Sequence, residues 1–246
     1  MTMRDQIVST LKKEYEQNFN EAKFSEIISR VSAVIGLDEL PQVMALTYFE
    51  KQRALLVLTE KRMLLGYEGS KKQIQVEEIC YSHVVYTEHD LADILVMFTE
   101  DEAICLAKIS DSGYREISEY ISSRKNQDGS GKSLIKGPAQ KTSTAFSNTV
   151  ALFPYCAWFS CLYNGIRAKP LKYLFLAAVW LSLSIWVYKM DSWLLFFVFW
   201  IGGVFFYFWI QDNYSKELAP VLQRKYQNNW EKRKVLKLYP YQRMWN

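Results

Sequence analysis

Cysteine and histidine are scarce in this 246-residue chain, which has four of the first and two of the second. The cysteines are too scattered along the chain for a disulfide framework: Cys80, Cys105, Cys156 and Cys161. The histidines, His83 and His89, have no acidic or thiol neighbours at a spacing typical of metal ligands. We therefore expect reduced thiols, no metal site and no bound cofactor.

Catalytic constellations are missing as well. The segment Gly129-Ser-Gly-Lys-Ser133 ends like a phosphate-binding loop, but Asn126 stands where such a loop requires glycine. No buried strand precedes this segment, and Gly137-Pro138 follows it closely. Nothing else in the chain pairs a nucleophile with a base. The sequence therefore predicts no catalytic residues, and an enzyme is the less favoured hypothesis.

The first 13 residues are polar and lack the apolar core of a cleavable signal peptide, so we expect the amino-terminal half in the cytoplasm. Long apolar runs occur later. Half of all residues are apolar although the mean hydropathy is −0.12, which requires an uneven distribution. Residues 150–210 hold only five charged side chains, all in the breaks between apolar runs. This pattern is typical of lipid-embedded segments, because a charge inside the bilayer is costly.

The formal net charge of +4 conceals two halves of opposite sign. Residues 1–125 hold 15 Lys/Arg and 21 Asp/Glu, a net charge of −6, whereas residues 126–246 hold 15 and 5, a net charge of +10. Basic residues beside apolar spans are attracted to anionic lipids. We therefore expect membrane lipids, and not nucleic acid, as partners of the basic half.

The acidic half predicts an α+β domain. Apolar residues recur at helical spacing through residues 3–35, so residues 1–40 are predicted to form a helical extension. Seven β-like runs separated by polar turns follow: 43–49, 54–58, 63–67, 74–79, 83–87, 94–98 and 103–109. A helix capped by Ser112 comes next. This order predicts, over residues 41–125, an antiparallel barrel or sandwich of the pleckstrin-homology (PH) type with a carboxy-terminal capping helix.

Residues 54–67, ALLVLTEKRMLLGY, resemble the second and third strands of the bacterial PH-like domains of the YokE type. In those domains an apolar strand passes through a Thr-x-Lys-Arg turn into another apolar strand. Residues 76–85 resemble a later segment of the same domains, and the resemblance covers about residues 40–124. Because that family has no common enzymatic activity, the resemblance implies a PH-like fold and a scaffold role.

The basic half predicts a linker over residues 126–148 and a membrane region over residues 149–211. Residues 171–188 and 193–210 are each about 18 residues long, enough to cross most of the bilayer core, and their only charged residue is Lys172 at the start of the first. The short turn between them predicts an α-helical transmembrane hairpin. Residues 149–167 are either interfacial or spanning. The positions of Lys and Arg favour the interfacial arrangement, because it leaves every basic cluster in the cytoplasm. The expected location is the inner (plasma) membrane.

Residues 212–246 carry apolar side chains at every fourth position among basic ones. They predict a basic amphipathic helix on the inner leaflet, and the alternative is that the apolar stripe packs against the soluble domain. Candidate ligands of lipid headgroups lie in two turns of the PH-like domain and in this tail: Lys51, Arg53, Lys61, Arg62, Arg224, Lys225, Lys232, Arg233 and Lys234. Gly202 and Gly203 interrupt a bulky face of the second span and predict a helix–helix contact, within the hairpin or between protomers.

These features favour a membrane-anchored adaptor or scaffold that faces the cytoplasm, with a PH-like domain that binds a protein partner or another copy of the chain. The alternative is an oligomeric pore-forming or membrane-perturbing effector of a bacterial defence or toxin–immunity system, with the soluble domain as its sensor. A secondary transporter is disfavoured, because neither clear span contains a charged residue apart from Lys172 at the start of the first.

Overall fold

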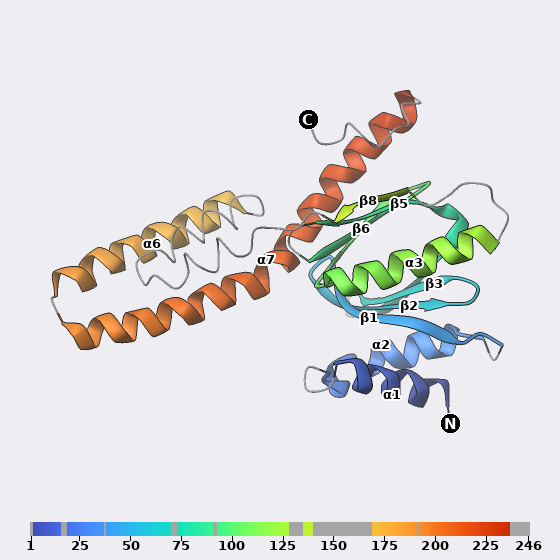
Figure 1. The fold of residues 1–246 in the computed structure, drawn as a ribbon, viewed down its shortest axis with the longest axis horizontal. Helices are drawn as coiled ribbons and strands as arrows, with labels where there is room; N and C mark the ends of the chain where they lie inside the picture. The colour runs from blue at the N-terminus through green and yellow to red at the C-terminus, as the bar shows by residue number, and fades with distance from the viewer. Residues whose placement is uncertain are drawn as a thin grey trace.

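The computed structural model describes residues 2–15, 19–36, 38–69, 73–90, 93–127, 135–139, 169–190 and 192–236. A sheet with helices packed around it forms one end of the molecule, and a long helical hairpin projects from it (Figure 1). The helices are α1 (Met3–Tyr15), α2 (Glu21–Val34), α3 (Asp111–Gln127), α6 (Pro170–Lys189) and α7 (Trp193–Leu236). The strands are β1 (Pro41–Phe49), β2 (Gln52–Thr59), β3 (Met63–Glu68), β4 (Ile74–Ile79), β5 (Val84–Asp90), β6 (Ile94–Thr99), β7 (Ala103–Ala107) and β8 (Ile135–Ala139).

The eight strands have the order β4-β3-β2-β1-β7-β6-β5-β8. Neighbours from β4 to β5 are antiparallel, as the hairpin-like spacing predicts, and the expectation of a mixed α+β fold is confirmed. β8 pairs in parallel with β5. It lies within residues 126–148, for which we expected only a linker. Part of that segment therefore extends the sheet.

The middle of the sheet is buried on both faces. In β2, Ala54, Leu56 and Leu58 point into an inner core that also contains side chains of β6, β7 and α3. Leu55 and Val57 point the other way, into a layer formed with α1 and α2. Strands read as continuous apolar runs when both of their faces are covered. This explains why the runs of β2, β6 and β7 do not alternate with polar residues.

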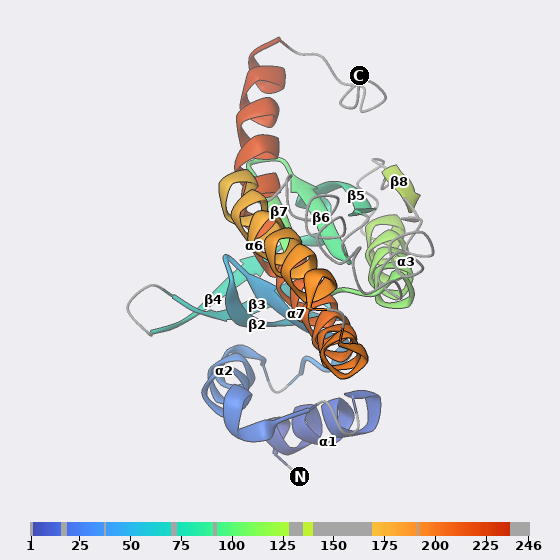
Figure 2. The same ribbon diagram turned by 90° about the vertical axis from the view of Figure 1, so that its left-hand side faces the viewer.

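The outer faces of β6 and β7 are covered by the second half of α7. Val96, Phe98 and Cys105 form a cluster with Leu218 and Tyr226, and all five are buried. The sequence favoured placing this stripe of α7 on the lipid surface. The structure instead has the stripe against the sheet, the alternative arrangement, because the sheet presents a matching apolar face. Figure 2 shows the hairpin end-on and α7 continuing past β7.

Helix α2 approaches β3 closely at Gly66. A Cβ added to Gly66 would collide with Val31 and lie 3.2 Å from Ile27 Cγ2. We therefore expect Gly66→Ala to destabilise the fold by about 1–3 kcal/mol, because α2 must move away from the sheet. Gly113→Ala is the control, since the nearest atom would lie at 3.4 Å, an ordinary contact. Thermal unfolding followed by circular dichroism measures both, and equal losses would contradict the close α2–β3 contact.

Candidate membrane anchor and its junction with the sheet

Helix α6 is the one helix in the described part of the chain that is long and apolar enough to cross a membrane. It has 20 residues, and an 18-residue stretch of it has a mean hydropathy of 1.6 with only 22% of that stretch buried. At 1.5 Å per residue its length is about 30 Å, the thickness of the bilayer core. Pro170 stands in its first turn, where the missing N–H has no helical partner. Lys189 in its last turn complements the helix dipole.

Helix α7 begins with a shorter apolar stretch, Trp193–Phe206, and continues without a break to Leu236 over 44 residues. The sequence suggested a span that ends at Ile210, followed by a separate tail. In the structure the two are one helix, about 66 Å long at 1.5 Å per residue. Its hairpin part and its sheet part run in different directions (Figure 1). Pro220 lies inside the helix, and proline is the commonest cause of such a bend.

The two helices of the hairpin are joined by stacked aromatic rings. Trp180 of α6 stacks on Phe199 and on Phe206 of α7, with ring centroids 4.6 and 4.7 Å apart. A Cβ on Gly202 would meet no atom within 4 Å, so Gly202 is not in a close contact inside the hairpin, whereas Gly203 is buried. A contact between protomers at Gly202 stays a prediction.

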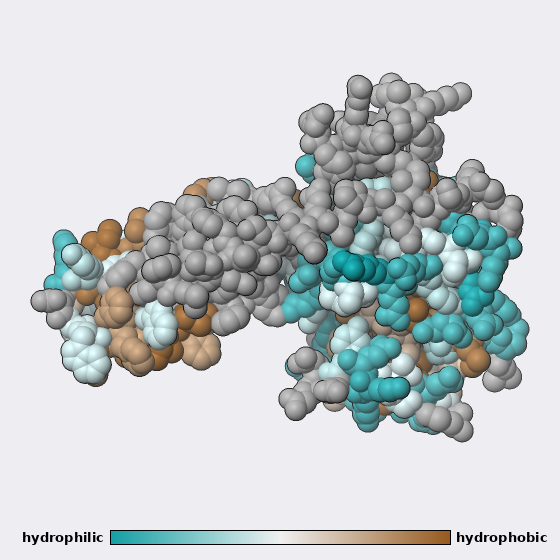
Figure 3. All heavy atoms as spheres, viewed as in Figure 1, coloured by the Kyte–Doolittle hydropathy of each residue, from teal (hydrophilic) through white to brown (hydrophobic). Residues whose placement is uncertain are grey.

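The outer surface of the hairpin is strongly apolar. Large side chains are left mostly exposed there: Leu171 (83%), Trp193 (79%), Tyr188 (76%), Phe205 (72%) and Phe175 (68%). Figure 3 shows hydrophobic residues gathered on the hairpin and hydrophilic residues over the sheet domain. Apolar surface of this extent marks an interaction site or a membrane-contacting surface.

A cluster of charged side chains joins α6 to α7 at the end of the hairpin that meets the sheet domain. Glu217 of α7 accepts hydrogen bonds from Lys172 Nζ at 2.5 Å and from the Tyr173 hydroxyl at 3.0 Å. Lys169 Nζ lies 3.8 Å from the same carboxylate. Burial raises the pKa of Glu217, but the bonds from Lys172 and Tyr173 outweigh it and hold the pKa below its usual range. The charged carboxylate therefore ties the start of α6 to α7.

Beyond this cluster, α7 is attached to the outer face of the sheet by packing and hydrogen bonds. The Tyr226 ring lies 5.5 Å from the Phe98 ring, and its hydroxyl donates to Glu88 Oε1 at 3.3 Å. The Ala103 N–H of β7 donates to Gln227 Oε1 at 2.9 Å. The junction thus combines a buried apolar stripe with bonds that fix its register on β7.

The turn Thr59-Glu-Lys-Arg62 forms a structural clamp. The Arg62 guanidinium donates to Glu39 at 3.1 Å, to Glu78 at 2.5 Å and to the Val34 carbonyl at 3.1 Å. Thr59 Oγ1 donates to Glu39 Oε1 at 2.5 Å. Burial raises the pKa of Glu39, but the bonds from Thr59 and Arg62 outweigh it and lower the pKa. The clamp fastens the end of α2 to the β2–β3 turn.

The predicted headgroup ligands are not gathered into one site. Lys61 and Arg62 stand at one end of β2, and Lys51 and Arg53 at the other, a separation of about 25 Å at 3.3 Å per residue. Lys61 is paired with Asp38, and the Arg53 guanidinium donates to the Lys23 carbonyl at 2.9 Å.

The remaining candidates belong to α7. Arg224 and Lys51 line a cavity of about 530 Å³ beside Glu102, and Lys225 is exposed. The backbone of Lys232, Arg233 and Lys234 belongs to α7, and the described structure does not extend to their side chains.

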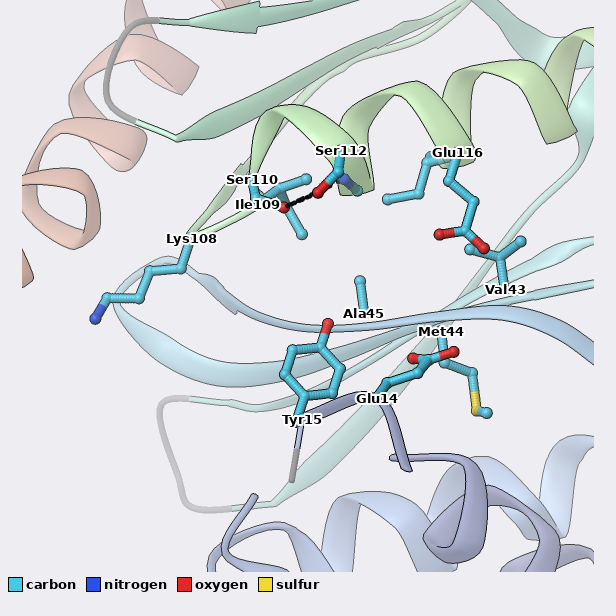
Figure 4. A pocket seen from close by; sticks show the side chains of 12 residues that line it. Glu14, Tyr15, Val43, Met44, Ala45, Lys108, Ile109, Ser110, Ser112 and Glu116 are labelled. Atoms are coloured by element: carbon cyan, nitrogen blue, oxygen red, sulfur yellow. Dashed lines mark hydrogen bonds between the residues drawn. The ribbon is translucent and has the colours of Figure 1, made fainter. Parts of the chain in front are cut away.

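A second cavity, of about 320 Å³, lies between α1, β1 and the start of α3 (Figure 4). It is lined by two carboxylates, Glu14 and Glu116. Burial, and next the charge of Glu116, raise the pKa of Glu14. Lys108 points away from this cavity in Figure 4. The negative lining disfavours an anionic ligand here.

Other reactive side chains have structural surroundings. His89 Nε2 lies 2.7 Å from the Ile109 carbonyl, and its ring stacks on Tyr114 at 5.4 Å. Within the described residues, no group of three or more His, Cys, Asp or Glu side chains could hold a metal ion. Cys80 is exposed and Cys105 is buried, both as free thiols, and the other two cysteines lie outside the described residues.

Comparisons with known proteins give no family. No model of a known protein family matches the chain, and no curated protein matches it. Among solved structures, the hSac2 domain from the human phosphoinositide phosphatase Sac2 shares 12% identity with the chain. That match covers 55% of this chain and 91% of that domain, with a TM-score of 0.35, too low to support a functional argument. The described part of the chain is a mixed α+β protein with one helix long and apolar enough to cross a membrane.

Proposed function

We propose that the chain is a membrane-anchored adaptor. The α6–α7 hairpin spans the inner (plasma) membrane, and a PH-like sheet domain on the cytoplasmic side binds a protein partner or another copy of the chain. The observation that carries this proposal is the continuity of α7. Its first half displays apolar side chains such as Phe205, and its second half is buried against β7. One helix therefore joins the membrane to the domain.

The dimensions of the hairpin support two crossings. α6 is about 30 Å long and the antiparallel part of α7 runs beside it (Figure 1). The tip of the hairpin carries Tyr188 and Trp193, both strongly exposed. Tyr and Trp are the residues enriched at the membrane–water interface. The tip therefore fits the far interface, and the ionic cluster at Glu217 fits the near one.

The number of crossings supports the same topology, because only an even number returns the chain to the side of the membrane on which it started. The sheet precedes the hairpin in sequence and the second half of α7 follows it, yet the two pack together and must lie on one side of the membrane. Two crossings, by α6 and α7, satisfy this condition. A third crossing by residues 149–167, which lie outside the described residues, would not. The basic residues around the hairpin favour the cytoplasm as the shared side.

Cysteine labelling in intact cells tests this topology. In a cysteine-free background, Ser192→Cys at the hairpin tip should react with a membrane-impermeant maleimide without permeabilisation. Lys225→Cys, an exposed position on the sheet half of α7, should react only after permeabilisation. Labelling of both positions from the same side would contradict the hairpin. Release of the chain from membranes by alkaline carbonate would contradict the anchor itself.

Cross-linking of the full chain in its native membrane tests the adaptor role. A discrete adduct with one other protein, or a dimer, is the expected product. A ladder of larger homo-oligomers, together with dye leakage from vesicles containing the purified chain, would overturn the adaptor and fit the pore-forming effector instead.

A further inference from the structure

We propose that the base of the hairpin is a binding surface for the phosphate of anionic phospholipids, formed by Lys169, Lys172 and Lys216. This inference rests on the proposed membrane anchor and names the lipid class that the anchor selects. None of these three lysines belongs to the headgroup ligands that the sequence suggests.

The three lysines lie where the hairpin meets the sheet domain. Lys169 and Lys172 are at the start of α6, and Lys216 is in the part of α7 opposite them. Lys172 and Lys169 both approach Glu217, and Lys216 is its neighbour in sequence. The apolar run of α7 ends at Ile210, so Lys216 lies about 9 Å further along the helix axis. The headgroup layer on each side of the bilayer core is of the order of 5–8 Å thick. The Lys216 backbone therefore lies just outside this layer. Helical side chains lean toward the N-terminal end, here toward the membrane, so the Lys216 ammonium group can reach the lipid phosphates.

Aromatic rings orient two of the ammonium groups. Lys216 Nζ lies 4.4 Å from the centre of the Tyr48 ring, and Lys172 Nζ lies 5.6 Å from the centre of the Trp209 ring. Trp209 is 48% exposed on the hairpin surface. Interfacial Trp and Tyr sit at headgroup level with their polar edges in water. Trp209 thus places the Lys172 ammonium group beside the first lipid shell, whereas Tyr48, in β1, holds Lys216 at the edge where the sheet domain meets the hairpin.

The charge where the hairpin meets the sheet domain is positive. Among the described side chains of residues 169–172 and 213–217, Lys169, Lys172 and Lys216 stand against Glu217, a net charge of +2. An ammonium group has three N–H donors, so a lysine that bonds to Glu217 retains donors for a phosphate oxygen. The side chains of Lys169 and Lys172 are 44% and 37% exposed, so both remain accessible to lipid.

The test compares anionic and zwitterionic lipids around the full chain. The chain is reconstituted in phosphatidylcholine vesicles with trace spin-labelled phosphatidylglycerol or spin-labelled phosphatidylcholine, and electron spin resonance measures the motionally restricted fraction of each. We expect phosphatidylglycerol to associate about fivefold more strongly at low salt, equivalent to about 1 kcal/mol. The preference should fall as salt screens the charges.

The decisive variant is Lys169→Gln/Lys172→Gln/Lys216→Gln, which should associate equally with both lipids. The matched control is Lys13→Gln/Lys23→Gln/Arg30→Gln, which removes the same charge from exposed positions of α1 and α2 and should keep the preference. Replacing Lys169, Lys172 and Lys216 with arginine should also keep the preference for phosphatidylglycerol. This variant changes the same positions but keeps their charge, so it separates loss of charge from misfolding.

Three results would overturn the proposal. Equal association of both lipids with the reconstituted wild type would refute the lipid preference while leaving the anchor intact. Failure of the wild type to enter vesicles would refute the anchor and this surface together. A wild-type preference that the hairpin variant retains would assign the preference to other residues and also refute the surface.

Discussion

Replacing Arg62 with alanine is expected to destabilise the sheet domain by about 3 kcal/mol, the lower end of the range for breaking a buried ion pair. Glu39 is only 1% exposed, and its carboxylate depends on Arg62 and Thr59 for hydrogen bonds. Without the guanidinium, the buried carboxylate keeps only the Thr59 hydroxyl and a long hydrogen bond of 3.4 Å from the Gly36 N–H. Because all eight tryptophans lie beyond residue 157, tryptophan fluorescence does not report on the sheet. Pulse proteolysis in urea is the suitable measurement.

Lys61→Ala is the matched control for this experiment. Lys61 is the neighbouring base, and its ion pair with Asp38 joins side chains that are 54% and 77% exposed. Exposed pairs of this kind contribute about 0–1 kcal/mol. Equal effects of the two substitutions would mean that the Arg62–Glu39 pair is as solvated as the surface pair, and the clamp would be refuted.

The ion pair between Arg62 and Glu39 also makes the free energy of unfolding depend on pH. The pKa of Glu39 is lower in the folded chain than its ordinary value of 4.5. A carboxyl with a depressed pKa stabilises the fold above the unfolded pKa, and this contribution is lost as the pH falls through the folded pKa. Wild type should therefore lose stability below about pH 4.5. The difference between wild type and Arg62→Ala should narrow as acid neutralises Glu39, so a constant difference would contradict this assignment.

The elements of the sheet domain were largely predictable from sequence. The apolar run at residues 74–79 is β4 without any shift of its ends, and the other predicted runs differ from β1 to β7 by a few residues at their ends. Local signals suffice here, because polar turns separate short runs rich in β-branched and aromatic residues. β8 was missed because Gly137 and Pro138 disfavour a strand in an interior position but not at an edge.

The sequence did not indicate which helix covers each face of the sheet. The outer residues Val96 and Phe98 indicate that something covers β6, but the sequence does not say which helix does so. The basic residues at Thr59–Arg62 predict headgroup ligands, because nothing in the local sequence shows that Glu39 packs against this turn. The polar residues after Ile210 resemble a helix end. The helix continues, since burial of Leu218 and Tyr226 on either side offsets the single hydrogen bond that Pro220 removes.

Replacing Tyr226 with alanine is expected to cost about 3–5 kcal/mol, the range for deleting a large buried aromatic side chain. The ring is 1% exposed, packs on Phe98 and donates to Glu88. Its loss leaves a cavity between α7 and the sheet and removes a bond to a buried carboxylate. Hydrogen–deuterium exchange should rise in β6, β7 and the second half of α7, whereas the first half of α7 stays protected by lipid.

Val221→Ala is the control for this substitution, because Val221 lies on the same stretch of α7 but is 38% exposed. A surface change of this kind usually alters stability by no more than about 0.5 kcal/mol. If the two variants exchange alike, α7 does not pack on the sheet in the membrane, and the hairpin and the domain are joined only by a flexible connection. If exchange rises only in Tyr226→Ala, the contact between α7 and β7 holds the sheet domain at a fixed orientation to the membrane. An adaptor built on one continuous helix requires such a contact.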